Sequence, residues 1–100
     1  DNTDGSVIEK ADPKTKKPPM YKVILLNDDF TPMDFVVQLL VEVFNRTLEE
    51  AKDITVTIHD KGKGVAGSYN FELAEQKKAE SVAISRNNGH PLTILVEKIE

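Results

Sequence analysis

The chain has 100 residues, of which 39% are hydrophobic and 6% aromatic, so it supports one small domain and not a second. Its formal net charge is −4 with acids and bases interspersed, which disfavours a nucleic-acid binder because such proteins present basic stripes to phosphates. It contains no cysteine, which fits a reducing compartment, and no apolar run approaches the roughly 20 residues that span a membrane.

The composition of residues 1–19 predicts a flexible N-terminal extension. They include Pro13, Pro18 and Pro19, balanced acids and lysines, and too few apolar side chains to offset the entropy of ordering. A solvated linker is the simplest interpretation, and an arm that another protein engages is the functional one. We expect the folded domain to span residues 20–100.

The first predicted strand is the β-rich run from Met20 to Leu26, and residues 27–29, Asn-Asp-Asp, form a turn signal after it. A helix follows, with Thr31 as its N-cap and Pro32 at its first position. Apolar residues then recur at helical spacing, and the pair Asn45-Arg46 is expected to end this helix.

A second helix begins at Thr47, which forms the capping-box pattern with Glu50. Glycines from Gly62 onward break it, and residues 65–69 can form a short strand.

A third helix is predicted from its N-cap Asn70 to about Asn87, where Asn88-Gly89 stops it. Residues 92–98 form the last strand. The predicted order is β-α-α-β-α-β.

Asn27, Asp28 and His59 are the polar residues that could carry chemistry. The turn sequence can be merely structural, and a histidine near a helix C-terminus can be a favourable dipole contact. Alternatively, the amide, carboxylate and imidazole accept hydrogen bonds from a cation with several donors. Zinc sites usually have more than one His or Cys, and the alternating acids of a calcium loop are missing. We therefore expect no catalysis, metal or cofactor, and His90 looks like a loop residue.

Two helix faces could enclose an apolar slot. Met33 and Val36 share one face, and Thr55 and Ile58 share another. If these faces meet beside the Asn27 turn, acceptors lie at the mouth of the slot. Periodicity alone leaves open whether they meet.

The run from Tyr21 to Val36, with its strand, acidic turn and proline-started helix, resembles the signature of the ClpS family, the adaptor of the N-degron pathway. His59, residues 62–64 and the His90-Pro91-Leu92 segment also match, so the resemblance covers roughly residues 18–98. It implies an α+β domain in which a three-stranded antiparallel sheet packs against three helices. It also implies a non-enzymatic adaptor that binds a substrate's first residue (Phe, Tyr, Trp or Leu). The resemblance further implies that the adaptor docks on the N-terminal domain of a ClpA or ClpC unfoldase and delivers the substrate for degradation by ClpP.

The resemblance also implies roles for individual residues. Asn27, Asp28 and His59 match the positions that hold the substrate's α-amino group, so binding is expected to weaken as His59 becomes protonated. The side-chain pocket is matched by Asp29, Thr31, Met33, Val36, Thr55, Ile58 and Leu92, and the unfoldase-binding face by Glu72 and Lys77. Thr55 departs from the family, in which many members have Met, and we expect poorer binding of Leu relative to aromatic first residues.

Two other interpretations were weighed against the adaptor. The same topology resembles the C-terminal domain of the ribosomal stalk protein, an interaction domain that should lack the Asn-Asp-Asp turn with a distant histidine. The other alternative interpretation is a small metal-dependent enzyme. For the adaptor we expect a monomer in the bacterial cytoplasm, ahead of a plastid stroma, with no nucleic-acid or membrane partner.

Overall fold

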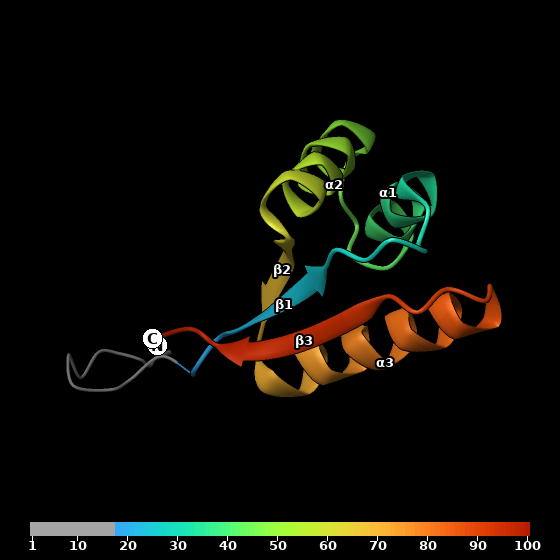
Figure 1. Cartoon of the computed structure of the whole chain (residues 1–100). Helices are drawn as coiled ribbons and strands as arrows, with labels where there is room; N and C mark the ends of the chain where they lie inside the picture. Colours follow the sequence, from blue (N-terminus) through green and yellow to red (C-terminus); the bar gives the residue numbers. More distant parts are fainter. Residues whose placement is uncertain (1–17) are drawn as a thin grey trace.

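The computed structural model of the chain describes residues 18–100 (Figure 1). Most of the predicted flexible extension therefore lies outside the described residues. The elements follow the predicted order, and they are β1 (Tyr21–Leu26), α1 (Met33–Glu42), α2 (Leu48–Lys61), β2 (Lys63–Tyr69), α3 (Phe71–Asn87) and β3 (Thr93–Lys98). This confirms the α+β fold with three helices and three strands.

The three strands form one antiparallel sheet in the order β2-β1-β3, so β1 is central. The pairing of β1 with β2 shifts by one residue between Val23 and Ile24, which leaves Ala66 as an extra residue in β2. The Ala66 carbonyl accepts a hydrogen bond from Arg46 Nε at 2.7 Å. The bulge is therefore satisfied by a side chain from the connection between α1 and α2.

All three helices pack against the same face of the sheet. Alternate residues of a strand share a face, so Tyr21, Val23 and Leu25 point together. Tyr21 contacts the ring of Phe71 in α3 at a centroid distance of 5.1 Å, and Val23 and Leu25 belong to the buried cluster that includes α1 and α2 side chains. Figure 1 shows α1 and α2 together near the end of β1, while α3 runs along β3.

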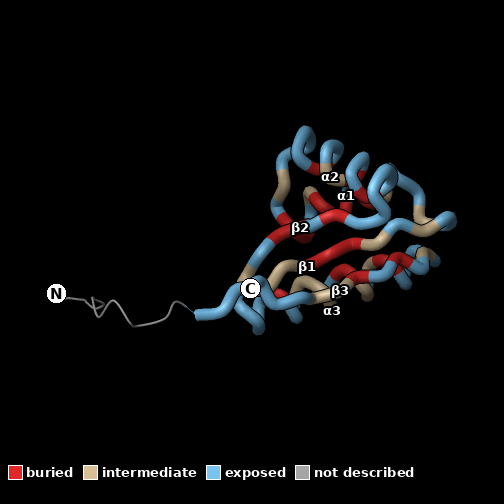
Figure 2. Tube along the Cα trace, turned by 60° about the vertical axis from the view of Figure 1, so that its left-hand side comes forward, coloured by how far each residue is buried: buried red, intermediate tan, exposed pale blue. Residues whose placement is uncertain are grey.

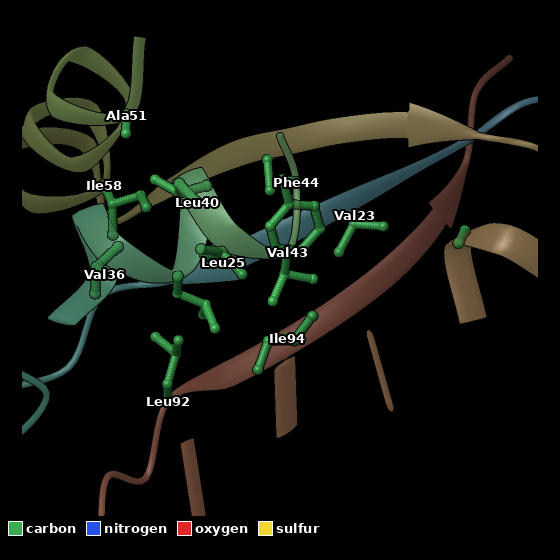
Figure 3. Packing of buried hydrophobic residues seen from close by; sticks show 13 residues of the cluster. Val23, Leu25, Val36, Leu40, Val43, Phe44, Ala51, Ile58, Leu92 and Ile94 are labelled. Carbon is green, nitrogen blue, oxygen red and sulfur yellow. The ribbon is translucent and has the colours of Figure 1, made fainter. Parts of the chain in front are cut away.

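The core lies between this sheet face and the helices. Figure 2 shows the buried residues along the strands and the inner sides of the helices, and Figure 3 shows how the cluster interdigitates. The core is made almost entirely of aliphatic side chains, with Phe44 as its one buried aromatic residue among the described positions. Its members from α1, α2 and the chain before β3 converge at one end, at Val36, Ile58 and Leu92.

The first residues of the three helices can be compared with the predicted N-caps. The second is confirmed, because Thr47 Oγ1 accepts from the Glu50 N–H and the Glu50 carboxylate accepts from the Thr47 N–H. The third is also confirmed, because Asn70 Oδ1 accepts from the Leu73 N–H at 2.9 Å. The first is wrong by one residue: Pro32 occupies the cap position, in an extended conformation and without a side-chain cap.

The first helix also ends earlier than predicted, at Glu42, because Asn45 adopts a left-handed conformation (φ 56°) that reverses the chain. Gly62, with φ 89°, also adopts a left-handed conformation and ends α2. Among the described helices, none combines the length and apolar character that crossing a membrane requires.

Candidate functional site

The turn after β1 is organised by one carboxylate. Asp28 Oδ1 accepts hydrogen bonds from the N–H groups of Phe30 and Thr31, both at 2.7 Å, and Oδ2 accepts from the Thr31 hydroxyl at 2.8 Å. Burial is the largest single influence and raises the pKa of Asp28, but these bonds and the charge of His90 together outweigh it and lower that pKa. Asp28 is therefore ionised at neutral pH, with Oδ1 saturated and a lone pair free on Oδ2.

This arrangement also explains the error at the start of α1. Thr31, predicted to cap the helix, is held in the turn because both its N–H and its hydroxyl donate to the Asp28 carboxylate. Thr31 therefore belongs to the turn, and α1 begins only after Pro32.

A small cavity opens beside this turn, between the end of β1, the first turns of α1, the C-terminal half of α2 and the residue before β3. Its volume is about 20 Å³, which is room for roughly one water molecule. The cavity is lined by Leu26, Asn27, Asp28, Thr31, Met33, Val36, Thr55, Ile58, His59 and Leu92. The structure thus brings together every predicted recognition residue except Asp29, which is exposed and does not line the cavity.

The cavity is apolar in its depth. Val36, Ile58 and Leu92 are at most 5% exposed, and Figure 3 shows Val36 and Ile58 next to each other. Thr55 is also buried, and its hydroxyl donates to the Ala51 carbonyl at 2.7 Å within α2. The hydrogen of the Thr55 hydroxyl is therefore not available to a ligand. Met33 differs from the other walls because it is 46% exposed.

Hydrogen-bond acceptors gather at the mouth. The Asn27 side chain is exposed, while its backbone N–H donates to the Gly62 carbonyl at 2.9 Å and ties the turn to the end of α2. His59 is 61% exposed, with Nδ1 at 3.3 Å from the Asp60 carboxylate. Because an ionised carboxylate only accepts, this contact favours a proton on Nδ1 and leaves Nε2 as an acceptor.

Three residues of this region had no role in the site assigned to them from the sequence. Leu26 lines the cavity as the last residue of β1. Gly64 stands behind the α2 wall, where a Cβ atom would lie 2.8 Å from Ile58 Cγ1. His90 packs edge-on against Phe35, with ring centroids 4.5 Å apart. The glycine cluster and the His-Pro pair were visible in the sequence, but their contacts join segments that are far apart along the chain.

The two residues predicted to face an unfoldase have different surroundings on α3. Glu72 is exposed in the first turn, beside Pro18, Pro19 and Phe71. Lys77 is half-buried: its Nζ donates to the Val43 carbonyl at 2.6 Å and lies 5.9 Å from the centre of the Tyr69 ring.

The described part of the chain holds no group of three or more His, Cys, Asp or Glu side chains arranged to bind a metal ion. The fold and the site define a small α+β binding domain, with an apolar slot and acceptors for a donor-rich group at its mouth.

Comparison with known proteins identifies the family. The family model for the ATP-dependent Clp protease adaptor protein ClpS matches residues 16–95. The ClpS adapter protein of Rhodospirillum centenum is 49% identical over 92 residues, covering 92% of this chain and 85% of the relative. That of Paraburkholderia xenovorans is 45% identical over 98 residues, covering 98% of this chain and 94% of the relative. The chain belongs to the ClpS family of Clp protease adaptors.

A solved structure agrees with this assignment. Agrobacterium tumefaciens ClpS2 bound to L-phenylalaninamide matches with a TM-score of 0.80 and 34% sequence identity, covering 83% of this chain and 100% of that one.

Proposed function

We propose that this chain binds the free N-terminal residue of a protein substrate, with a preference for bulky apolar first residues, and delivers the substrate to a Clp unfoldase. The observation that carries the proposal is the cavity, which combines a buried aliphatic interior with an ionised carboxylate, an amide and an imidazole at its mouth. The ligand of the Agrobacterium relative, L-phenylalaninamide, has a free α-amino group and an amide in place of the next peptide bond, so it resembles the start of a chain.

In this proposal Asn27, Asp28 and His59 bind the α-ammonium group. An ammonium group offers three donors and no acceptor, and the mouth offers an amide oxygen, the free lone pair of Asp28 Oδ2 and His59 Nε2. Bonds to a charged donor are stronger than neutral ones. A residue inside a chain lacks this charge, so it leaves these acceptors unsatisfied and is rejected.

The apolar walls bind the side chain of the first residue. Burying a Phe or Leu side chain contributes roughly 1.5–3 kcal/mol. The cavity of about 20 Å³ is too small for an aromatic ring, so a wall has to move on binding. Met33 is the best candidate, because its side chain is half exposed and methionine is flexible. The walls of α2 and Leu92 are buried and stay in place.

Delivery involves other surfaces of the molecule. We assign docking on the N-terminal domain of a ClpA- or ClpC-type unfoldase to the α3 face that carries Glu72, which is exposed and free to contact a partner. Lys77 contributes chiefly by holding the end of α1, because its ammonium group already donates to Val43. Residues 1–19 are the segment for the unfoldase to engage, and the adaptor acts as a monomer in the cytoplasm. The comparisons favour this function over the ribosomal-stalk alternative.

The test is a pair of binding titrations at neutral pH with peptides that differ only at the amino terminus, one starting with free Phe and one N-acetylated. Acetylation removes the charge and leaves the side chain intact. Loss of a charge-assisted bond of about 1.5–3 kcal/mol predicts roughly 10- to 150-fold weaker binding of the acetylated peptide. A free peptide starting with Gly controls for the side-chain half of the site. Equal affinity of the free and acetylated Phe peptides would contradict the proposed mechanism.

A further inference from the structure

One interior wall of the recognition cavity carries a hydroxyl group. Thr55 is buried on the inner face of α2, one turn after Ala51 and one turn before Ile58, which are both labelled in Figure 3. It lines the cavity together with Ile58, Val36 and Leu92, and these three walls are alkyl groups. Thr55 therefore provides the one side-chain oxygen among the four buried walls.

The Thr55 hydroxyl can act on a ligand only as an acceptor. Its hydrogen is donated to the Ala51 carbonyl at 2.7 Å, which also fixes the orientation of the group. Among residues 18–100 no group donates to the Thr55 oxygen, so the lone pairs of that oxygen are free to accept. A threonine side chain is so short that each of its heavy atoms lies within two bonds of the oxygen. Whichever atom faces the cavity, the oxygen is therefore close to the cavity surface.

The depth of this oxygen below the mouth of the cavity suits a tyrosine side chain. His59 is exposed at the mouth, and Thr55 precedes it by one turn on the same side of α2. Four residues advance an α-helix by about 6 Å. The phenol oxygen of a tyrosine stands a little more than one helical turn beyond its Cα atom. A first-residue tyrosine whose amino group is bound at the mouth therefore carries its hydroxyl to the level of Thr55.

We propose that Thr55 is a specificity-determining residue whose oxygen accepts a hydrogen bond from the hydroxyl of a first-residue tyrosine. Burying a phenol hydroxyl without a partner is costly, and an acceptor that is already in place removes this cost. Phenylalanine has no donor on its ring and gains nothing from the same oxygen. The inference rests on the proposed function and names Tyr as the first residue that the site favours over Phe.

The test is a set of competition titrations with peptides that differ only in their first residue, Tyr or Phe. They are measured on the intact chain and on Thr55→Val, which keeps the branched shape and removes the hydroxyl. Thr55→Val is expected to bind the Tyr peptide about 5- to 30-fold more weakly than wild type and the Phe peptide within about twofold of wild type. Thr55→Ser retains the hydroxyl and is expected to keep the wild-type ratio of the two affinities.

Thr57→Val is the matched control. The Thr57 hydroxyl also donates to the carbonyl one turn earlier, that of Asp53, at 3.1 Å, but Thr57 is exposed and does not line the cavity. This variant is expected to leave both affinities unchanged. A third peptide starts with 4-methylphenylalanine, which is close to tyrosine in size but has no donor. It is expected to bind wild type more weakly than the Tyr peptide does, and to lose no affinity in Thr55→Val.

Three results would overturn the role of Thr55. One is a ratio of Tyr to Phe affinity that is the same in Thr55→Val as in wild type. Another is a change of that ratio in Thr57→Val as large as the change in Thr55→Val. The third is a 4-methylphenylalanine peptide that binds wild type as tightly as the Tyr peptide, a measurement that stands even if Thr55→Val does not fold.

These failures are distinct from failure of the proposed function. As long as the wild-type chain distinguishes a free from an acetylated Phe peptide, the recognition of the amino group stands and only the role of Thr55 is refuted. Loss of that distinction would contradict the proposed function itself.

Discussion

The proposed function gives Asp28 two roles, and the substitution Asp28→Asn separates them. The carboxylate holds the turn through three donors, and Oδ2 keeps one free lone pair, which the proposal assigns to the ligand. Asparagine can place its oxygen where Oδ1 accepts the two N–H groups and its amide nitrogen where Oδ2 was. The Thr31 hydroxyl can rotate and accept from that nitrogen, so the turn survives, whereas the incoming ammonium group meets a donor instead of an acceptor.

The two roles predict different magnitudes. Stability should fall by no more than about 1 kcal/mol, because the backbone bonds of the turn are retained. Affinity for a Phe-starting peptide should fall by about 1.5–3 kcal/mol, or roughly 10- to 150-fold, because a charge-assisted bond is lost. Asp28→Ala removes the acceptor for all three donors and should lower both quantities. Asp53→Asn, which makes the same charge change on an exposed part of α2, should bind within about twofold of wild type.

The assay is fluorescence anisotropy with a labelled Phe-starting peptide at pH 7 and 0.15 M salt, paired with thermal melts of each variant. If Asp28→Asn binds as well as Asp53→Asn, Asp28 only organises the turn, and the account of the ammonium site is wrong.

Thr55→Met lengthens one wall with a flexible side chain and should raise the affinity of a Leu-starting peptide relative to a Phe-starting one; an unchanged ratio in competition binding would show that this wall does not select the ligand. Gly64→Ala places a Cβ too close to the α2 wall, so both melting temperature and peptide affinity should fall, and wild-type values would contradict the contact. Ser85→Ala removes a buried hydroxyl that has no hydrogen-bond partner among residues 18–100 and should raise the free energy of unfolding by about 1 kcal/mol in a denaturant titration, where a decrease would refute the reasoning. Lys77→Met keeps the apolar stem but loses the bond to the end of α1, so it should lower that free energy by about 0.5–1.5 kcal/mol relative to its neighbour variant Lys78→Met; equal stabilities would argue that the bond contributes nothing.

The helix caps show which features a sequence can predict. Thr47 with Glu50, and Asn70 with the N–H three residues later, form hydrogen bonds within one turn of chain, so their geometry follows from spacing alone. Thr31 has the same residue type and the same place before a helix, but a stronger acceptor, the Asp28 carboxylate, lies three residues earlier. The prediction failed there because Asp28 holds both the N–H and the hydroxyl of Thr31 within the turn, so Pro32 takes the cap position.

The site itself was predictable only in pieces. Met33 with Val36, and Thr55 with Ile58, could be assigned to helix faces from their spacing. That these faces meet beside the turn depends on the packing of α1 and α2 against one sheet face, which no local pattern specifies. The family resemblance supplied that step. The places of Gly64 and His90 in this region could not be predicted for the same reason, because each contacts a segment that is distant along the chain. Gly64 lies against Ile58, and His90 packs against Phe35.

The two halves of the recognition site differ in rigidity, and this difference bears on selectivity. The Asp28 carboxylate is fixed before any ligand arrives, because three hydrogen bonds hold it, whereas the side chains of Asn27 and His59 are exposed. A preorganised acceptor binds an ammonium group without a reordering cost, so it can demand a free amino terminus strictly. The side-chain half is nearly closed and is bounded on one side by the exposed Met33. Opening this pocket costs free energy, and only the burial of a large apolar side chain offsets that cost. In the proposed function, small first residues satisfy the acceptor half but cannot open the other, so we expect the site to select for both the amino group and the side chain.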